Sequence, residues 1–238
     1  MNPAAASAKR RARPFLEPVV NRKTLFAGVI GLAAALGLVM LVGCNQDSST
    51  AAAGTGNKSV AITSDDRTLG NPNAPIQFVE YAAPSCPHCA HFNEEVFPFL
   101  KANYIDTGKV YYIFRVFPIG PQDIPAEQLA RCEPKASYFA FIDMLFRQQQ
   151  VWDPEYGITN VQAGLIQVAN AAGMSQDKAM ACMQNKAEED RINKSAQDAV
   201  TKYNLNSTPS FVINGTVRAA GFDQDSLKKF LDALLSKK

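Results

Sequence analysis

The motif Cys-Pro-His-Cys at residues 86–89 carries the clearest chemical signal in this chain of 238 residues. It follows an apolar run over residues 76–82 that predicts a buried strand, and it opens an amphipathic stretch from about residue 89 to residue 104 that predicts a helix. Two cysteines at this spacing on a helix lie on one face and can close a small disulfide. The unpaired N–H groups and the dipole at a helix N-terminus favour an anion, so Cys86 should form the reactive thiolate.

Three other uses of the motif are less favoured. A structural zinc site needs a second pair of ligands, and the chain's two histidines, His88 and His91, lie in the same turn. Covalent haem attachment needs a histidine directly after the second cysteine, where this chain has Ala90. A permanent disulfide that closes so short a loop would add little stability. The motif therefore indicates a redox switch, and we expect no metal and no other cofactor.

The N-terminus predicts export from the cytoplasm. Residues 1–26 are basic and residues 27–43 contain no charged residue, which together form an export signal over residues 1–43. The last apolar residues and Cys44 resemble the lipobox of bacterial lipoproteins, in which the cysteine is lipidated and becomes the first mature residue. An uncleaved membrane anchor and simple cleavage are the alternatives. We expect a protein held at the membrane by lipid or by an N-terminal anchor.

The number of cysteines agrees with an oxidising compartment. With Cys44 set aside for lipid, the other four of the five cysteines form the pairs Cys86/Cys89 and Cys132/Cys182. A bridge between Cys132 and Cys182 would contribute about 4 kcal/mol to stability, and two free buried thiols are the alternative. The net charge is +2 and includes the basic leader. Without a basic patch that carries interleaved aromatic residues, nucleic acid is not an expected partner.

The remaining chain reads as a tether over residues 45–64 and one domain over residues 65–238. A second strand over residues 110–117 completes a βαβ unit with the first strand and its helix. A helical insertion of about residues 121–204 follows, and an Asn-Gly turn between two short strands then predicts a hairpin before a last helix. The elements expected after the βαβ unit are helices near 122–132, 135–149, 160–172 and 175–203 (the last one broken), strands over 210–214 and 216–219, and a helix over 223–236.

This order resembles the DsbA family of thioredoxin-fold proteins. The resemblance covers nearly all of residues 66–237, and it rests on the Cys-Pro-His-Cys motif, on the step Thr208-Pro209 before the hairpin, and on Glu80 six residues before Cys86. It implies an α/β thioredoxin fold, βαβ…ββα, with a helical subdomain inserted between the two halves. It also implies a thiol–disulfide oxidoreductase of the bacterial envelope that transfers a disulfide to newly exported proteins.

The resemblance gives the two cysteines different roles. Cys86 would be the nucleophile that forms mixed disulfides with substrate, and Cys89 would resolve them or close the internal disulfide. His88 and Pro87 would tune the pKa of Cys86, with His88 and the helix N-terminus stabilising its thiolate. A solvated surface imidazole is the alternative for His88. Each unit of Cys86 pKa below ambient pH stabilises the reduced form by about 1.4 kcal/mol, which makes the disulfide a stronger oxidant.

Three further residues acquire roles from the same resemblance. Pro209 would follow a cis peptide bond and face the dithiol, with a trans proline as the alternative. The backbone of Thr208 would then be free to bind an extended substrate as an added strand. Glu80 lies in the middle of an apolar run, so it would be a buried carboxyl group with a raised pKa that relays a proton to Cys89. A carboxylate that reaches solvent at the strand end is the alternative for Glu80.

The expected partners are unfolded or reduced exported proteins and a membrane redox partner that reoxidises the dithiol. The expected location is the periplasm or cell envelope, with membrane attachment. A disulfide isomerase or reductase is the alternative within the enzymes, and a Cu(I) metallochaperone that uses the same two thiols is the alternative outside them. Dimeric isomerases of this type carry an N-terminal dimerisation domain, for which residues 45–65 are too short and too polar, so we expect a monomer.

Overall fold

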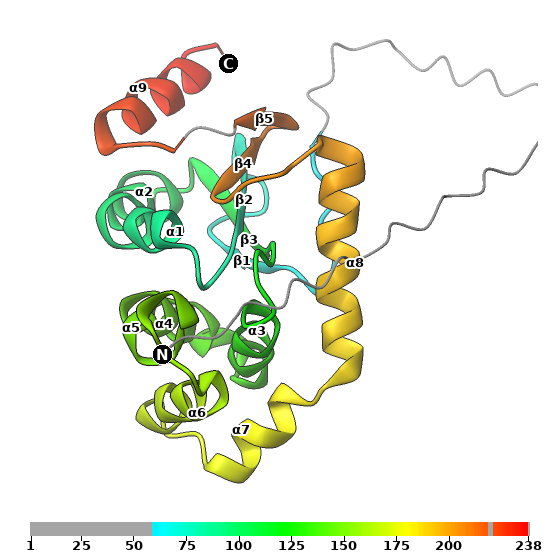
Figure 1. Ribbon diagram of the computed structural model, residues 1–238. Helices are drawn as coiled ribbons and strands as arrows, with labels where there is room; N and C mark the ends of the chain where they lie inside the picture. Colours follow the sequence, from blue (N-terminus) through cyan, green and yellow to red (C-terminus); the bar gives the residue numbers. More distant parts are fainter. Residues whose placement is uncertain (1–58, 219–220, 238) are drawn as a thin grey trace, which may run out of the picture. The chain divides into compact units, whose positions relative to one another are not determined.

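The computed structural model describes residues 59–218 and 221–237 and is built around a five-stranded sheet (Figure 1). The strands lie in the order β1-β3-β2-β4-β5. The central pair, β2 and β3, is parallel, and the other neighbouring pairs are antiparallel. Both central strands are nearly continuous apolar runs because both of their faces are covered. The bounds are β1 Arg67–Leu69, β2 Ile76–Ala82, β3 Val110–Val116, β4 Ser210–Ile213 and β5 Thr216–Arg218.

One long helical stretch connects β2 to β3 and carries the Cys-Pro-His-Cys motif at its start. It changes three times between α-helical and π-helical turns. The first π-helical turn ends at Val96, two residues before Pro98, which has no N–H to donate and whose ring crowds the carbonyl four residues earlier. The stretch consists of α1 Pro87–His91, η1 Phe92–Val96, α2 Phe97–Leu100 and η2 Lys101–Ile105.

The helical insertion between β3 and β4 has the predicted extent, with one difference in its interior. The predicted helix over residues 135–149 is divided, because Gln148 leaves helical geometry with φ −112° and ψ 22°. The predicted break in the last helix occurs at Asn185, whose side chain caps the following helix by accepting the N–H of Glu188. The elements are α3 Asp123–Cys132, η3 Lys135–Ser137, α4 Tyr138–Arg147, α5 Gln149–Trp152, η4 Pro154–Tyr156, α6 Val161–Ala171, α7 Gln176–Met183 and α8 Lys186–Tyr203.

The C-terminal part forms the predicted hairpin and final helix. Asn214 and Gly215 connect β4 to β5 with φ values of 48° and 78°, which is the left-handed geometry that a two-residue hairpin turn requires. The helix α9 (Gln224–Leu235) begins with a capping box between Asp223 and Ser226. The chain therefore follows the βαβ, insertion, ββα order of a thioredoxin fold with a helical subdomain, as the resemblance implied.

Successive residues of β2 serve opposite faces of the sheet. Phe78 packs in the larger core, on the face that carries α1, α2 and α9. Val79 and Tyr81 pack in a smaller cluster with Ala199 of α8 (Figure 1). By the same alternation, Glu80 lies on the face of the sheet that carries the dithiol helix.

The folded part begins earlier than residue 65, where the sequence analysis placed its start. Val60 is buried, and both its N–H and its C=O are hydrogen-bonded to the side-chain amide of Gln77 in β2. β1 was not expected either, because a three-residue strand is defined by its pairing with β3 rather than by any pattern of its own.

Candidate active site: a dithiol at the start of a helix

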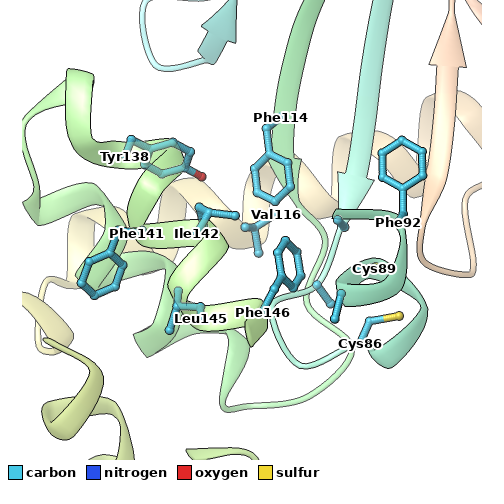
Figure 2. Close-up of a cluster of buried hydrophobic side chains, with 14 of the residues drawn as sticks. Cys86, Cys89, Phe92, Phe114, Val116, Tyr138, Phe141, Ile142, Leu145 and Phe146 are labelled. Atoms are coloured by element: carbon cyan, nitrogen blue, oxygen red, sulfur yellow. The ribbon is translucent and has the colours of Figure 1, made fainter. Parts of the chain in front are cut away.

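The two thiols lie at the N-terminus of α1, at the edge of the larger core (Figure 2). Cys86 is the N-cap residue, and its carbonyl oxygen accepts the N–H groups of Cys89 and Ala90 at 3.1 and 3.0 Å. Pro87 occupies the first helical turn, where its missing N–H is not needed and its fixed φ suits the helix. Both thiols are free; Cys86 is 4% exposed and Cys89 is 0% exposed. Cys86 is therefore the more accessible of the two sulfur atoms.

The environment of Cys86 favours its thiolate. A hydrogen bond from the Cys89 thiol, hydrogen bonding with Thr208 and the backbone N–H groups of Cys89 and His88 together lower the pKa of Cys86 to about 6, against the opposing effect of burial. These groups stabilise the negative charge where the helix dipole also favours it. At neutral pH the sulfur of Cys86 is therefore mainly a thiolate, the form that attacks disulfides and leaves from them.

The environment of Cys89 has the opposite effect. Burial raises the pKa of Cys89 well above its usual range, and the hydrogen bond that it donates to Cys86 and the charges of Cys86 and Glu80 raise it further. Cys89 therefore remains a protonated thiol beside an ionised Cys86. The two sulfur atoms of one motif thus have different chemistry, and this asymmetry is what a nucleophile and its resolving partner require.

The loop before β4 brings Thr208 and Pro209 to the dithiol. The Thr208–Pro209 peptide bond is cis, as the resemblance to the DsbA family implied. The carbonyl oxygen of Thr208 lies 3.5 Å from Sγ of Cys86, although 122 residues separate them in the chain. The backbone next to the reactive sulfur is thus an irregular segment that leads into β4, at the place where an extended peptide could pair with it.

Glu80 is a buried acid on the same face of the sheet. It is 2% exposed, and burial raises its pKa to about 8, with a further contribution from the charge of Cys86. The hydroxyl of Tyr112 donates a 2.7 Å hydrogen bond to Oε2 of Glu80 and partly offsets this rise. The alternative in which the carboxylate reaches solvent is therefore excluded. Tyr112 was not predicted from the sequence, because one tyrosine in an aromatic strand carries no signal of a polar partner.

The imidazole of His88 lies on the exposed side of α1. The contribution of His88 that lowers the pKa of Cys86 comes from its backbone N–H, which any residue except proline would supply. The charge of the imidazole beside the thiolate remains a prediction, and it needs a test that leaves this N–H in place.

The two other cysteines of the described residues are paired with each other. Cys132 of α3 and Cys182 of α7 form a disulfide with a Cα–Cα distance of 6.0 Å, the pairing expected from the sequence. Cys44 and the export signal lie outside the described residues. Over residues 59–218 and 221–237, no helix is both long and apolar enough to cross a membrane. Within the same residues, no group of three or more His, Cys, Asp or Glu side chains could hold a metal ion.

Comparison with known proteins assigns this chain to a family. The sequence profile of the family described as Thioredoxin matches residues 63–233. The chain belongs to the thioredoxin family. Among the solved structures of this fold it is similar to α-DsbA1 of Wolbachia pipientis, with a TM-score of 0.69 and 31% identity over 77% of this chain and 97% of that one. The DsbA-like character inferred from the motif is thus confirmed.

Two further relatives carry names from disulfide chemistry. A protein of Rickettsia bellii named as a protein-disulfide oxidoreductase is 31% identical over 72% of this chain. This chain spans only 65% of the length of that relative. A protein of Novosphingobium aromaticivorans named as a protein-disulfide isomerase has a TM-score of 0.63 and 27% identity over 71% of this chain and 97% of that one.

Proposed function

We propose that the protein is a thiol–disulfide oxidoreductase that transfers a disulfide from Cys86 and Cys89 to exported proteins. The opposite pKa shifts of the two thiols carry this proposal: the pKa of Cys86 is lowered to about 6, and that of Cys89 is raised. A stabilised Cys86 thiolate favours the reduced form of the pair, so the oxidised form readily gives its disulfide away.

The exchange proceeds in two balanced steps. A substrate thiolate attacks Sγ of Cys86 in the oxidised protein; a mixed disulfide forms, the Cys86–Cys89 bond breaks, and Cys89 leaves and takes up a proton. A second thiolate of the substrate then attacks the substrate sulfur of the mixed disulfide. The substrate disulfide forms, Cys86 leaves as a thiolate, and two electrons have passed from the substrate to the dithiol. A membrane redox partner would remove these electrons to restore the disulfide.

Glu80 and the Thr208 backbone would each assist these steps. A carboxyl group with a pKa of about 8 is protonated at neutral pH and can supply the proton that Cys89 needs as it leaves. The backbone of Thr208, whose carbonyl oxygen lies 3.5 Å from Sγ of Cys86, would bind the substrate chain while its sulfur is attached.

The Cu(I) alternative is less compatible with the dithiol. Two-coordinate binding of a soft metal ion by this motif needs both sulfur atoms as thiolates. Burial and the neighbouring negative charge of Cys86 oppose ionisation of Cys89. The isomerase alternative stays in place, because one similar structure carries that name.

The proposed address is the cell envelope, with lipid attachment at Cys44. The apolar run that ends at this cysteine supports it, and the DsbA-like relationship favours an exported enzyme. Cys44→Ser in the full chain should prevent labelling with palmitate and leave the dithiol intact. If the wild-type chain incorporates no label and keeps residues 1–43, these residues form a permanent anchor instead.

The two single cysteine variants test the proposed activity. Cys86→Ser should abolish oxidation of a reduced, unfolded protein, and Cys89→Ser should accumulate mixed disulfides through Cys86. The wild-type protein should oxidise reduced substrate faster than it rearranges a substrate with scrambled disulfides. The reverse order would favour the isomerase, and full turnover by Cys89→Ala without glutathione would exclude the two-cysteine mechanism.

A further inference from the structure

A buried carboxylate of the helical insertion binds the backbone directly before the nucleophile. Asp123, the first residue of α3, is 0% exposed and accepts the N–H of Ser85 at 2.8 Å through Oδ1. Its other oxygen accepts the N–H groups of Ile119 and Gly120 at 2.9 and 3.0 Å. One carboxylate thus ties the loop before Cys86 to the loop that enters the insertion.

A buried amide binds the same segment through its carbonyl groups. Nε2 of Gln149, the first residue of α5, donates to the carbonyl oxygens of Pro84 at 2.8 Å and of Cys86 at 3.1 Å. Gln149 is 3% exposed, so water cannot readily replace these bonds. The amide therefore holds the carbonyl groups on both sides of Ser85, the residue before Cys86.

The helix that carries Gln149 is itself held in place. Trp152 of α5 is fully buried, and its indole N–H donates to the carbonyl of Leu145 at 3.0 Å. Gly164 of α6 allows the two helices to approach so closely that a Cβ there would lie 2.4 Å from the carbonyl oxygen of Val151. Since α5 cannot shift without disturbing this contact, the Gln149 amide is a fixed donor.

We propose that Asp123 and Gln149 are positioning residues of the dithiol: together they clamp the backbone of residues 84–86 and fix Sγ of Cys86 at the N-terminus of α1, against Thr208. The proposal deepens the proposed function, on which it rests, and gives the insertion a part in the chemistry. The segment they hold is a loop, and loops whose polar groups face solvent are mobile. Here three of its polar groups, the Pro84 and Cys86 carbonyls and the Ser85 N–H, are bound by the insertion instead.

Loss of this clamp should make the thiolate of Cys86 less stable. The thiolate of Cys86 is stabilised by donors that must lie within hydrogen-bond reach, and such interactions weaken steeply with misalignment. A looser clamp lets the sulfur sample positions away from Cys89 and from the helix N-terminus. The thiolate then becomes less favourable and the disulfide less oxidising.

Gln149→Met is the decisive variant, because methionine has a similar length and no N–H donor. Gln128→Met is its matched control: Gln128 is also 3% exposed, its Nε2 donates to a backbone carbonyl, that of Asn185, at 2.7 Å, and it is not among the groups that shift the pKa of Cys86. In the reduced, folded protein, the pKa of Cys86 is measured by thiolate absorbance, and the equilibrium constant with glutathione is measured beside it.

Gln149→Met should raise the pKa of Cys86 by about one unit and shift the equilibrium with glutathione up to about tenfold towards the oxidised protein. Gln128→Met should lose comparable thermal stability and leave both quantities unchanged. Equal values in the two variants would overturn the proposal. Asp123→Asn, which keeps the volume but turns an N–H donor towards a bound N–H, should act in the same direction as Gln149→Met.

A measurement on the unmodified protein covers the case in which neither variant folds. The amide proton of Ser85 should exchange with solvent as slowly as those of β2, and fast exchange would overturn the clamp. None of these readouts requires turnover. A protein that fails to oxidise substrate but shows the pKa difference would therefore refute the proposed function and keep the clamp.

Discussion

The hydroxyl of Tyr112 donates a 2.7 Å hydrogen bond to Oε2 of Glu80 across the two parallel central strands. Both side chains are buried, 2% exposed each, on the face of the sheet that carries the dithiol. Burial and the adjacent carboxyl group raise the pKa of Tyr112 well above its usual range, so the phenol remains a donor. The Tyr112 hydroxyl therefore lowers the proton affinity of Glu80, against the larger effect of burial.

Tyr112→Phe should raise the pKa of Glu80 further above 8, because it removes the hydrogen bond that lowers it. The inflection that Glu80 contributes to the pH dependence of substrate oxidation should move about one unit to higher pH. Tyr104→Phe is the control, since its hydroxyl also donates to a carboxylate, that of Asp232, at 2.9 Å. An unmoved inflection in Tyr112→Phe would show that Glu80 titrates independently of the phenol.

Glu80→Gln should change how stability depends on pH. The ordinary pKa of the carboxyl group is 4.5 and its pKa in the folded protein is about 8, so unfolding releases a proton between these values. Stability should be fullest below pH 4.5 and fall as the pH rises through 8, by about 5 kcal/mol for this group alone. Urea unfolding of the reduced protein at several pH values measures the loss, which should largely disappear in Glu80→Gln. An equal loss in both proteins would mean that Glu80 is ionised in the fold.

His88→Leu isolates the contribution of the imidazole, because leucine keeps the backbone N–H that lowers the pKa of Cys86. The pKa should rise from about 6 by about half a unit to one unit, and the potential of the pair should fall by about 15–30 mV. Thiolate absorbance against pH gives the first value. His91→Leu, in the same exposed turn, should have a smaller effect. An unchanged titration would leave the imidazole without the predicted role.

Removal of the second disulfide should affect stability rather than redox chemistry. The double variant Cys132→Ala and Cys182→Ala opens a loop with a sequence separation of 50 and should lose about 4 kcal/mol in the free energy of unfolding. The pKa of Cys86 should stay near 6, because the bridge holds the last residue of α3, whereas Asp123, which binds the loop before Cys86, is the first residue of that helix. A shift of this pKa beyond about half a unit would instead couple the bridge to the dithiol.

The strongly patterned parts of the fold were predictable from the sequence. The first central strand has the predicted bounds, and the second ends one residue earlier than predicted, because continuous apolar runs bounded by turn residues are local signals. The Asn-Gly hairpin and the broken last helix of the insertion also depend on neighbours in the chain. The dithiol depends on a short motif, so it too was accessible, whereas the cis bond before Pro209 was expected only from the resemblance to the DsbA family.

The supporting residues of the site were not predictable, because their roles come from distant contacts. Tyr112 binds a partner 32 residues away, Asp123 one 38 residues away, and Gln149 one 63 residues away. In isolation, Asp123 reads as an ordinary acidic residue in the first turn of a helix, and Gln149 reads as a surface glutamine. Only tertiary structure shows that both are buried against the loop of the nucleophile.

The pairing of β2 with both of its neighbours limits where residues can be inserted or deleted in this chain. β2 is hydrogen-bonded to β3 along its whole length and to β4 over Phe78–Tyr81. Deletion of one residue inside β2 would exchange the two faces of the strand beyond it and turn the carboxyl group of Glu80 towards α8. Insertions and deletions should therefore be tolerated in the surface turns, whereas even a single one in this strand would separate the buried acid from the dithiol.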